Sequence, residues 1–400
     1  MAYSTRFPQL QIPTICTTDV AQVAAAIITE YEGDFFQITT FAKTLAPGDP
    51  VRILLLRMAA RESQYRVLLN YGFQQNFILS AVGINLDAIG SNYGPLGARL
   101  PAASALTTLQ FSINAPINID IPIPINTTVS GSSSTANVVF QTTAAGTIPA
   151  GSTSVAIPAA CTQVGAIGNG YVAGQINSIL NWIPPFIVAV TNLTTTQGGA
   201  DVETDDAYAM RLALVPGAFS VAGSYQAYMF WGYTANVDIS SVSIVGPNGD
   251  INQTPPNTAA GYVDVYILLQ GGQIPGSSVI AQVQSFLSAT TIRPLGDFVT
   301  VKVPNVVNYN IVGTFWVDPK NQNMLPQIEQ QVQAVLPEFN TMTSSQIGRT
   351  VNPEHLGQMI MEAGASDYQL TAPTRRILDA SQVGIQSGTM ALQYGGLQPE

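Results

Sequence analysis

The hydrophobic positions in the first hundred residues follow a helical pattern. Apolar residues recur at helical spacing over 20–28, directly after Asp19, which can cap a helix. Residues 51–70 are apolar almost all round, as in a helix buried among several others, and Asp49-Pro50 before them is a start signal. A third helix is predicted over 75–89.

From about residue 100 the pattern changes to short alternating or β-rich runs. Clusters of Gly, Pro, Ser and Asn separate these runs, which is typical of an all-β domain. Pro122 and Pro124 cannot donate hydrogen bonds to a sheet, so their run is predicted to be an edge strand or a loop arm. The predicted strands are 107–113, 117–125, 137–141, 153–157 and 187–193.

The last two hundred residues mix helical and strand patterns in two successive groups. The first group has predicted helices at 203–214, 224–234 and 278–289, and predicted strands at 239–245, 262–269 and 298–303. The second group has predicted helices at 324–336 and 353–363, and predicted strands at 309–317, 368–371, 382–386 and 390–393. This order of elements predicts two small α+β sandwich domains.

The sequence therefore predicts a multidomain α+β protein. Its 400 residues are enough for several domains of ordinary size. The expected parts are an N-terminal helical, bundle-forming region at 1–100, an all-β domain at 101–200, an α+β domain at 201–304 and a C-terminal α+β domain at 305–400.

The composition narrows the classes of function. Only 10% of the residues are charged, against about 25% in ordinary soluble proteins, while 46% are hydrophobic. With so few charges to cover its exterior, the chain is expected to place much of its surface against other chains. The net charge of −10 argues against nucleic acid and anionic membranes as partners. No apolar run approaches the roughly 20 residues that span a bilayer, so no membrane insertion is expected.

The residues that carry most catalytic and metal chemistry are scarce. His355 is the sole histidine, and it follows Pro353-Glu354 on a predicted helix, where a surface or capping role is expected. The sequence has no Gly-x-Ser-x-Gly, His-Glu-x-x-His or Walker motif. Cys16 and Cys161 lie far apart, which favours free thiols in a reducing compartment. We therefore expect no catalytic residue, no metal site and no cofactor.

Two clusters resemble ligand sites only superficially. A calcium loop that begins at Asp201 would need Gly at its sixth and Glu at its twelfth position, where the chain has Asp206 and Leu212. Capping of the helix that follows explains these acids better. Four glycines lie in the all-β region and not between a strand and a helix, so tight turns are expected instead of a phosphate loop. The clusters consist of Asp201, Glu203, Asp205 and Asp206, and of Gly165, Gly168, Gly170 and Gly174.

Two predicted helices carry candidate interface residues. One holds four of the 14 basic residues, which either form a solvated face or make ion pairs with a neighbouring subunit. On that helix, Glu62 and Arg66 have the spacing of an i,i+4 ion pair. The other helix is rich in aromatic residues, some expected in the core and others as interface anchors. The candidates are Arg52, Arg57, Arg61, Arg66, Tyr225, Tyr228 and Trp231.

A series of motifs runs along the chain from about residue 50 to 390. It includes Leu86-Asp-Ala-Ile-Gly90, Arg99-Leu-Pro-Ala-Ala103 and Ile148-Pro-Ala-Gly151. The most specific part is Glu203-Thr-Asp-Asp-Ala207, followed by Ala222-Gly-Ser-Tyr-Gln-Ala-Tyr228. In order and spacing these motifs together resemble the baseplate J-like family of contractile phage tails of the Mu and P2 type.

The resemblance implies a structural baseplate wedge protein that lacks enzymatic activity. In such wedges two J-like chains join one I-like tail protein through a shared bundle of N-terminal helices, and sixfold repetition gives a ring of about twelve copies. It also implies contacts with sheath-initiator and hub or spike proteins, and a place in the virion tail after assembly in the host bacterial cytoplasm. Interface rearrangements would relay the trigger for sheath contraction. Residues 51–90 are expected to supply the bundle and 201–400 the ring contacts.

One alternative function stays open. Carbohydrate-binding or depolymerising tail proteins are also β-rich and rich in Thr and Asn, but they would require a long regular β-repeat or a carboxylate pair with aromatics. The sequence also does not separate an infectious phage from a phage-derived bacteriocin or injection machine.

Overall fold

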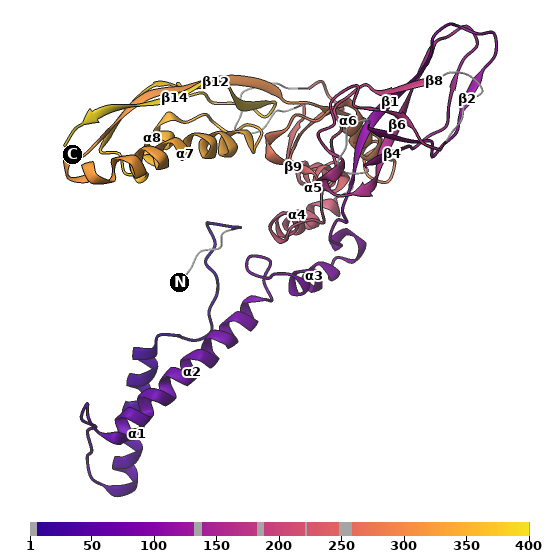
Figure 1. The fold of residues 1–400 in the computed structure, drawn as a ribbon. Helices are drawn as coiled ribbons and strands as arrows, with labels where there is room; N and C mark the ends of the chain where they lie inside the picture. The colour runs from indigo at the N-terminus through magenta and orange to yellow at the C-terminus, as the bar shows by residue number, and fades with distance from the viewer. Residues whose placement is uncertain (1–5, 132–137, 182–187, 221, 248–257, 400) are drawn as a thin grey trace. The chain divides into compact units, whose positions relative to one another are not determined.

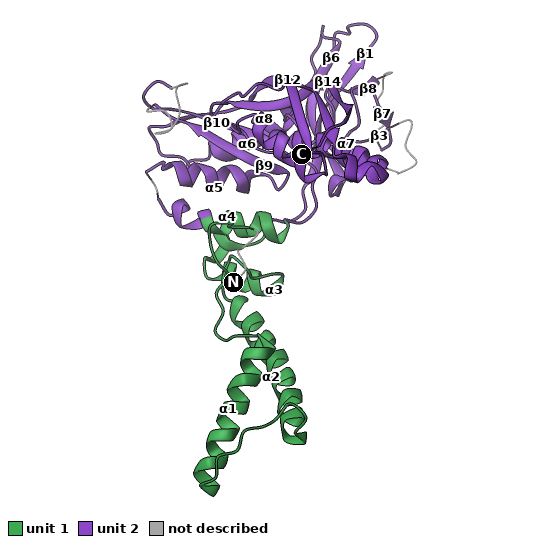
Figure 2. Ribbon diagram, turned by 90° about the vertical axis from the view of Figure 1, so that its left-hand side faces the viewer, with its two compact units in different colours: residues 1–99, 204–213 green, residues 100–203, 214–400 purple. Residues whose placement is uncertain are grey.

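The computed structural model describes residues 6–131, 138–181, 188–220, 222–247 and 258–399. The protein has the predicted mixed α+β multidomain fold, and it divides into two compact units (Figure 2). One unit comprises Met1–Arg99 and Thr204–Ala213, and the other comprises Leu100–Glu203 and Leu214–Glu400. Asn137 and Ile187, the first residues of two predicted strands, lie outside the described residues.

The first unit is helical. Its elements are α1 (Val20–Thr39), α2 (Pro50–Gln74), α3 (Ile84–Ser91), the 3-10 helix η1 (Gly94–Gly97) and the first part of α4 (Asp205–Ala218). The predicted helix at 75–89 is wrong over its first part, because side chains there satisfy the backbone in turns. Gln75 Oε1 accepts a hydrogen bond from Val82 N, and Ser80 Oγ donates to Gln74 O. The helix α3 begins only after Gly83, which has a φ of +53°.

The second unit begins with an all-β barrel. Six antiparallel strands follow the order β7-β3-β4-β6-β1-β8, and β2 and β5 form a separate two-stranded sheet. Asn192 at the end of β8 brings the two ends of the six-stranded sheet together, since its Oδ1 accepts from Ile176 N of β7 and its Nδ2 donates to Val172 O. The bounds are β1 (Ser104–Ile113), β2 (Ile121–Ile123), β3 (Thr128–Gly131), β4 (Val139–Thr142), β5 (Gly146–Ile148), β6 (Ser154–Val164), β7 (Ile176–Ile179) and β8 (Val188–Asn192).

The barrel confirms most of the sequence interpretation of this region. The run 117–125 forms a strand only at β2, which pairs with β5 alone among the described strands, as expected of an edge. Three of the four glycines lie at bends or turns, since Gly165, Gly170 and Gly174 have φ values of +97°, +86° and +89°. Gly168 instead ends the 3-10 helix η2 (Ala166–Gly168). The strands β3, β5 and β7 were not predicted, because three or four residues are too few to show an alternating pattern.

A small α+β domain follows the barrel. Its sheet has the order β11-β10-β9, with β10 parallel to β11 and antiparallel to β9. The helices α5 and α6 share one apolar core with this sheet. The elements are α5 (Tyr225–Ala235), β9 (Ile239–Val245), β10 (Tyr262–Leu269), the 3-10 helix η3 (Gln270–Gly272), α6 (Ser277–Leu287) and β11 (Phe298–Lys302). The predicted ends of these helices and strands differ from the observed ones by at most two residues.

The C-terminal domain is a second α+β layer. Its sheet has the order β13-β12-β14, and α7 and α8 cover one face (Figure 1). The elements are β12 (Asn305–Val317), the 3-10 helix η4 (Pro319–Met324), α7 (Leu325–Ser344), α8 (Pro353–Glu362), β13 (Asp367–Ala372) and β14 (Gln382–Leu397). The predicted end of α7 at Leu336 is wrong, since the helix continues through Pro337 while Phe339 and Thr343 remain buried. The strands predicted at 382–386 and 390–393 form one strand.

Candidate assembly surface

The start signals predicted for α1 and α2 are confirmed. Asp19 Oδ1 accepts a hydrogen bond from Ala21 N at 2.9 Å, and Asp49 Oδ1 accepts one from Val51 N at 2.8 Å. These bonds satisfy backbone donors that a helix leaves free in its first turn. Pro50 follows Asp49 as the first residue of α2, a position where the missing N–H has no cost.

A small apolar core joins α1 to α2. Ala59 of α2 packs against Val23 and Ala24 of α1, and Leu55 packs near Ile28. Residues 55 and 59 are one turn apart and therefore lie on the same face of α2. Only Leu55, Ala59, Ser63 and Asn70 of this helix are buried, so α1 covers one narrow stripe.

Many of the other side chains of α2 are both apolar and exposed. Leu68 is 64% exposed, Leu54 60% and Tyr65 58%. The sequence of α2 thus has the pattern of a helix buried among several others, but within the described residues α1 is the helix that packs along it. The exposed large apolar residues of α2 are Ile53, Leu54, Leu56, Met58, Tyr65, Val67, Leu68, Leu69 and Tyr71.

Most of these side chains fall into two stripes, one on each side of the stripe that contacts α1. At 3.6 residues per turn, successive residues are separated by about 100°. One stripe contains Leu54, Met58, Tyr65 and Leu69, and the other contains Ile53, Leu56, Val67 and Tyr71. Arg57 and Arg61 lie between them, opposite α1.

The four arginines of α2 divide into two kinds. Arg66 donates two hydrogen bonds to Glu62 Oε1, at 2.9 and 2.6 Å, which confirms the predicted i,i+4 pair. Arg52 donates to Leu45 O at 2.8 Å. Arg57 and Arg61 are exposed, and their side chains have no hydrogen bond or ion pair with the part of the chain that the structure describes. Arg57 and Arg61 are thus the two arginines of α2 whose side chains have no partner within the described residues.

A cluster of polar side chains ties α4 to the segment after α3. Arg99 donates to Asp87 Oδ1 at 2.8 Å and to Asp205 Oδ1 at 2.7 Å, and its guanidinium lies over the ring of Tyr208. Burial opposes the charge of Arg99, but its bonds to Asp205 and Asp87 raise its pKa overall. From the next turn of α4, Arg211 donates to Ala98 O at 2.7 Å. These contacts hold the exit of α3 and η1 against α4.

Close packing at this cluster requires two glycines. A Cβ atom on Gly90 would collide with the Tyr208 hydroxyl, and one on Gly97 would collide with the carbonyl of Gly90. Tyr208 is 1% exposed and its hydroxyl donates to Gly97 O. Gly90 and Arg99 of the sequence motifs therefore have a structural role.

The acidic cluster lies at the start of α4, and its members also bind other segments. Asp205 and Asp206 occupy the first turn of α4, as predicted. Burial alone would raise the pKa of Asp205, but hydrogen bonds from Gly83 N and Arg99 lower it overall. Asp206 forms an ion pair with Arg6 at 2.6 Å. Sequence reasoning missed these long-range partners because nothing in the sequence pairs a carboxylate with a particular arginine.

The aromatic residues of α5 have different environments. Tyr228 is 2% exposed and donates to Asp297 Oδ2 at 2.6 Å, so its side chain belongs to the core and we correct its assignment as an interface anchor. Burial, followed by the bond to Asp297, raises the pKa of Tyr228. Trp231 is half-buried against the rings of Phe230 and Phe286. Tyr225 is 52% exposed and is the aromatic candidate with the most accessible ring.

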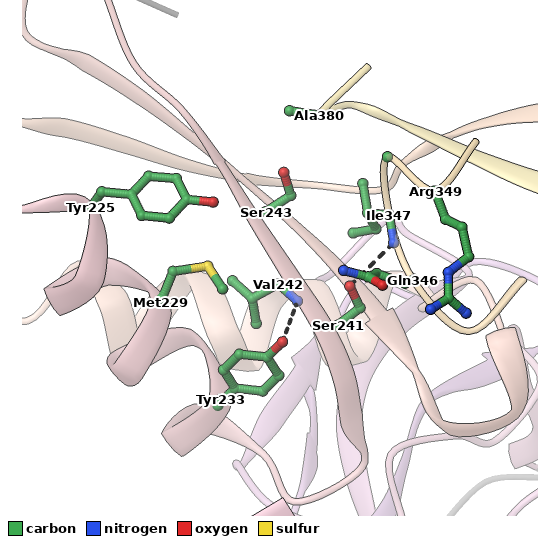
Figure 3. Close-up of a pocket in the computed structure, with 11 residues that line it drawn as sticks. Tyr225, Met229, Tyr233, Ser241, Val242, Ser243, Gln346, Ile347, Arg349 and Ala380 are labelled. Carbon is green, nitrogen blue, oxygen red and sulfur yellow. Dashed lines mark hydrogen bonds between the residues drawn. The ribbon is translucent and has the colours of Figure 1, made fainter. Parts of the chain in front are cut away.

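Tyr225 lies at the rim of a cavity of about 280 Å³ (Figure 3). The cavity is bounded by α5, β9 and the loop Gln346–Arg349. Tyr233 and Ser241 accept hydrogen bonds from backbone N–H groups there, at 3.4 and 3.2 Å. The sole charged residue of its lining is Arg349, which donates to Met342 O at 2.6 Å. This lining contains no carboxylate, histidine or thiol for acid–base or nucleophilic chemistry.

His355 lies in the first turn of α8 and is half-buried. The cap of this helix is Asn352, whose side chain accepts from Glu354 N at 3.2 Å. Among the described residues, no group of three or more His, Cys, Asp or Glu side chains could hold a metal ion. The helices in the described ranges include none that combines the length and apolar character needed to cross a membrane.

Two family models match parts of the second unit. Residues 108–199 match the family model of the baseplate J-like protein barrel domain, and residues 220–303 match that of the baseplate J-like central domain. The chain is 26% identical to baseplate protein J of Escherichia phage P2 over 181 residues, which are 45% of this chain and 55% of that protein. The chain thus spans about half the length of this curated relative.

A solved structure is also similar. It is a chain of the cryo-EM structure of the anti-feeding prophage baseplate, 6-fold symmetrised. The alignment covers 95% of this chain and 100% of that chain, with 12% sequence identity and a TM-score of 0.38.

Proposed function

Because its barrel and central domains place this chain in the baseplate J-like family, we propose that it is a structural subunit of the baseplate of a contractile phage tail. The name of the relative in phage P2 supports this location. The subunit would act through its contacts with other chains and not through a chemical reaction. It would be assembled in the cytoplasm of the host bacterium and then reside in the virion tail.

The observation that carries this proposal is the apolar surface of α2. Burying a Leu-sized side chain contributes about 1.5–3 kcal/mol, whereas association of two proteins costs roughly 4–15 kcal/mol. The nine exposed apolar side chains of α2 are still 40–64% exposed, so their complete burial would contribute roughly 7–13 kcal/mol, which is comparable to that cost. Helices from other chains would bury both stripes and complete a bundle around α2.

The proposed partners follow from the family resemblance. Two copies of this chain and one copy of an I-like tail protein would form a wedge, with residues 51–90 in the shared bundle. Residues 201–400 would supply contacts that close a ring of about twelve copies around the hub and spike. The low charge content supports permanent interfaces. Small rotations at these interfaces would relay the rearrangement that begins sheath contraction.

Native mass tests the wedge directly. Light scattering would be measured on the chain alone and on the chain co-expressed with its genomic neighbours. We expect a stable 2:1 complex with a second tail protein. A monodisperse monomer that binds none of its neighbours would contradict the proposal.

The role of the free arginines is tested by charge reversal. In the complex, Arg57→Glu with Arg61→Glu is expected to weaken binding of the second tail protein at least tenfold, because these arginines face outward without partners in the described chain. The control is Lys320→Glu with Arg375→Glu, which changes the net charge equally at exposed sites of the C-terminal domain. Equal binding by both double variants would remove the arginines from the interface.

A further inference from the structure

The two edges of the C-terminal sheet are built differently. In the order β13-β12-β14, the edge strand β13 has six residues, carries the exposed Asp367 and ends next to Pro373. The other edge strand, β14, has 16 residues and contains no charged residue and no proline. Short length, charge and proline are the usual means of blocking an exposed edge. β13 is short and charged and is followed directly by a proline, whereas β14 has none of these features.

The hydrogen bonds of β12 define which backbone groups of β14 face outward. Trp316 O accepts a hydrogen bond on the β13 side, so the neighbouring Phe315 directs its backbone groups towards β14. Phe315 and Tyr394 are in register in this parallel pair. The backbone N–H and C=O groups of Met390, Leu392 and Tyr394 therefore point away from β12, towards the free edge.

The first half of the β14 edge is covered within the chain. Gln382 O accepts a hydrogen bond from Gly348 N at 2.8 Å. Further along, Gln386 N donates to Asn340 Oδ1 at 3.2 Å. A loop and a side chain of α7 thus replace a neighbouring strand at this end.

The second half of the edge is open. Leu392 O accepts from Gln333 Nε2 of α7 at 2.9 Å. Within the described ranges, no other hydrogen bond is found for the outward backbone groups of Met390, Leu392 and Tyr394. Met390 is 43% exposed and Tyr394 36%. A groove of about 290 Å³ lies beside this segment, between α7 and β14, with Glu329, Gln330 and Gln333 on its α7 side.

We propose that residues 390–394 of β14 pair antiparallel with the same segment of a second copy of this chain, joining two three-stranded sheets into one of six strands. The inference rests on the proposed function, since it names one contact between copies in the ring. Two copies with a net charge of −10 each repel one another, and like charges placed opposite each other destabilise a strand pair. An uncharged edge is where two such chains can meet without that opposition.

The two-fold arrangement fixes a register. Outward-facing residues of antiparallel strands meet as hydrogen-bonded pairs, so a pair centred on Leu392 places Met390 opposite Tyr394 of the other copy. The Gln333 side chain would leave Leu392 O, which then accepts from the N–H of the other strand. Ala391 would face Gln393 of the other copy in a non-hydrogen-bonded pair, with Cα atoms about 4.5 Å apart. That separation allows a disulfide between cysteines at these positions.

Cysteine cross-linking tests this register in the full-length chain. In a Cys16→Ser background, the Ala391→Cys chain and the Gln393→Cys chain would be purified separately, then mixed and oxidised. The experiment would be done with the free chains and again with chains in complexes formed by co-expression with their genomic neighbours. We expect a covalent dimer in the mixture and at least tenfold less in either variant by itself. Thr371→Cys on β13 is the control for random collision. The proposal is overturned by no dimer in the mixture, by equal yields in all samples, or by a cross-link to a different protein.

A backbone substitution provides an independent measurement. Met390→Pro removes an N–H that faces the free edge, so the ladder with β12 keeps its hydrogen bonds. We expect at least a tenfold rise in the dissociation constant of the self-association, with circular dichroism unchanged.

Ala391→Pro removes an N–H that faces β12 and serves as the destabilised control. If Met390→Pro self-associates like the parent chain, the edge is not the contact. Binding of the second tail protein through α2 is measured separately, so either proposal can fail without the other.

Discussion

The guanidinium of Arg99 lies over the ring of Tyr208, with its Cζ atom 4.5 Å from the ring centroid. The same group donates hydrogen bonds to Asp87 of α3 and Asp205 of α4. One side chain thus joins two helices that are more than a hundred residues apart in the sequence.

Replacing Arg99 by Met is therefore expected to loosen the contact between α3 and α4. Met keeps the packing on Tyr208 but removes the bonds to Asp87 and Asp205, at a cost of about 1.5–3 kcal/mol. Hydrogen exchange should become faster in residues 84–99 and 205–213, while exchange in the barrel stays unchanged. Arg375→Met, at an exposed ion pair of 3.8 Å, is the matched control. Unchanged exchange in both segments would contradict the assigned role of Arg99.

A buried carboxylate in the second unit predicts that the free energy of unfolding depends on pH. Asp238 is 7% exposed, and burial raises its pKa from 3.8 to about 6 although the N–H groups of Gly198 and Gln270 lower it. The folded state then binds the proton more tightly than the unfolded chain. This contribution to stability is fully present below pH 3.8 and is lost as the pH rises through about 6.

Asp238→Asn should therefore stabilise the protein at pH 7.5, by up to about 3 kcal/mol, because a neutral amide carries no buried charge. The gain should disappear below pH 4, where Asp238 is protonated. Chemical unfolding of both proteins between about pH 3.5 and pH 8 measures the difference. Equal stabilities over this whole range would show that the burial of Asp238 has no energetic consequence.

Variants of Tyr228 and Tyr225 can distinguish a role in core packing from a role in assembly. Tyr228→Phe removes a buried hydrogen bond to Asp297 and should cost about 1.5–3 kcal/mol of stability, with association unchanged. Tyr225→Ala truncates an exposed ring and should leave the unfolding midpoint within about 2 °C. It should weaken association of the copies if Tyr225 is an interface anchor. Thermal unfolding and sedimentation on both variants give the two readouts, and a weaker association of Tyr228→Phe would reverse this assignment.

The sequence predicted elements best where apolar residues repeat over several turns or alternate over several residues. The strands β9 and β10 have the predicted ends, since each finishes with a run of five buried residues, most of them apolar. By contrast, α7 was expected to end before Pro337. The loss of one hydrogen bond is outweighed there by the burial of Phe339 in the C-terminal core. Local helix propensity cannot predict that α7 continues through Pro337, because the contacts that compensate for the proline come from strands distant in the sequence.

The candidate surface was partly predictable for a related reason. The all-round apolar character of α2 is visible in the sequence, and so is the Glu62–Arg66 pair, because both depend on positions within one helix. The cluster of Arg99 with Tyr208 and Asp205 was missed, since it depends on which segments the fold brings together. The open edge of β14 was missed because two short strands were expected where one long strand forms.

The apolar stripes of α2 give the most direct test of the helical bundle. Leu54→Gln with Leu69→Gln replaces two exposed side chains of one stripe, at 60% and 59% exposure. The stability of the chain alone should change by no more than about 0.5 kcal/mol, as for other exposed sites. Binding of the second tail protein should fall at least tenfold, because burial of a fully exposed Leu contributes about 1.5–3 kcal/mol and more than half of each of these side chains is still exposed. Leu55→Gln, on the stripe that contacts α1, is the control, because it should disrupt the packing of α1 against α2 itself. Full binding by the double variant would mean that α2 contacts no other chain through this stripe.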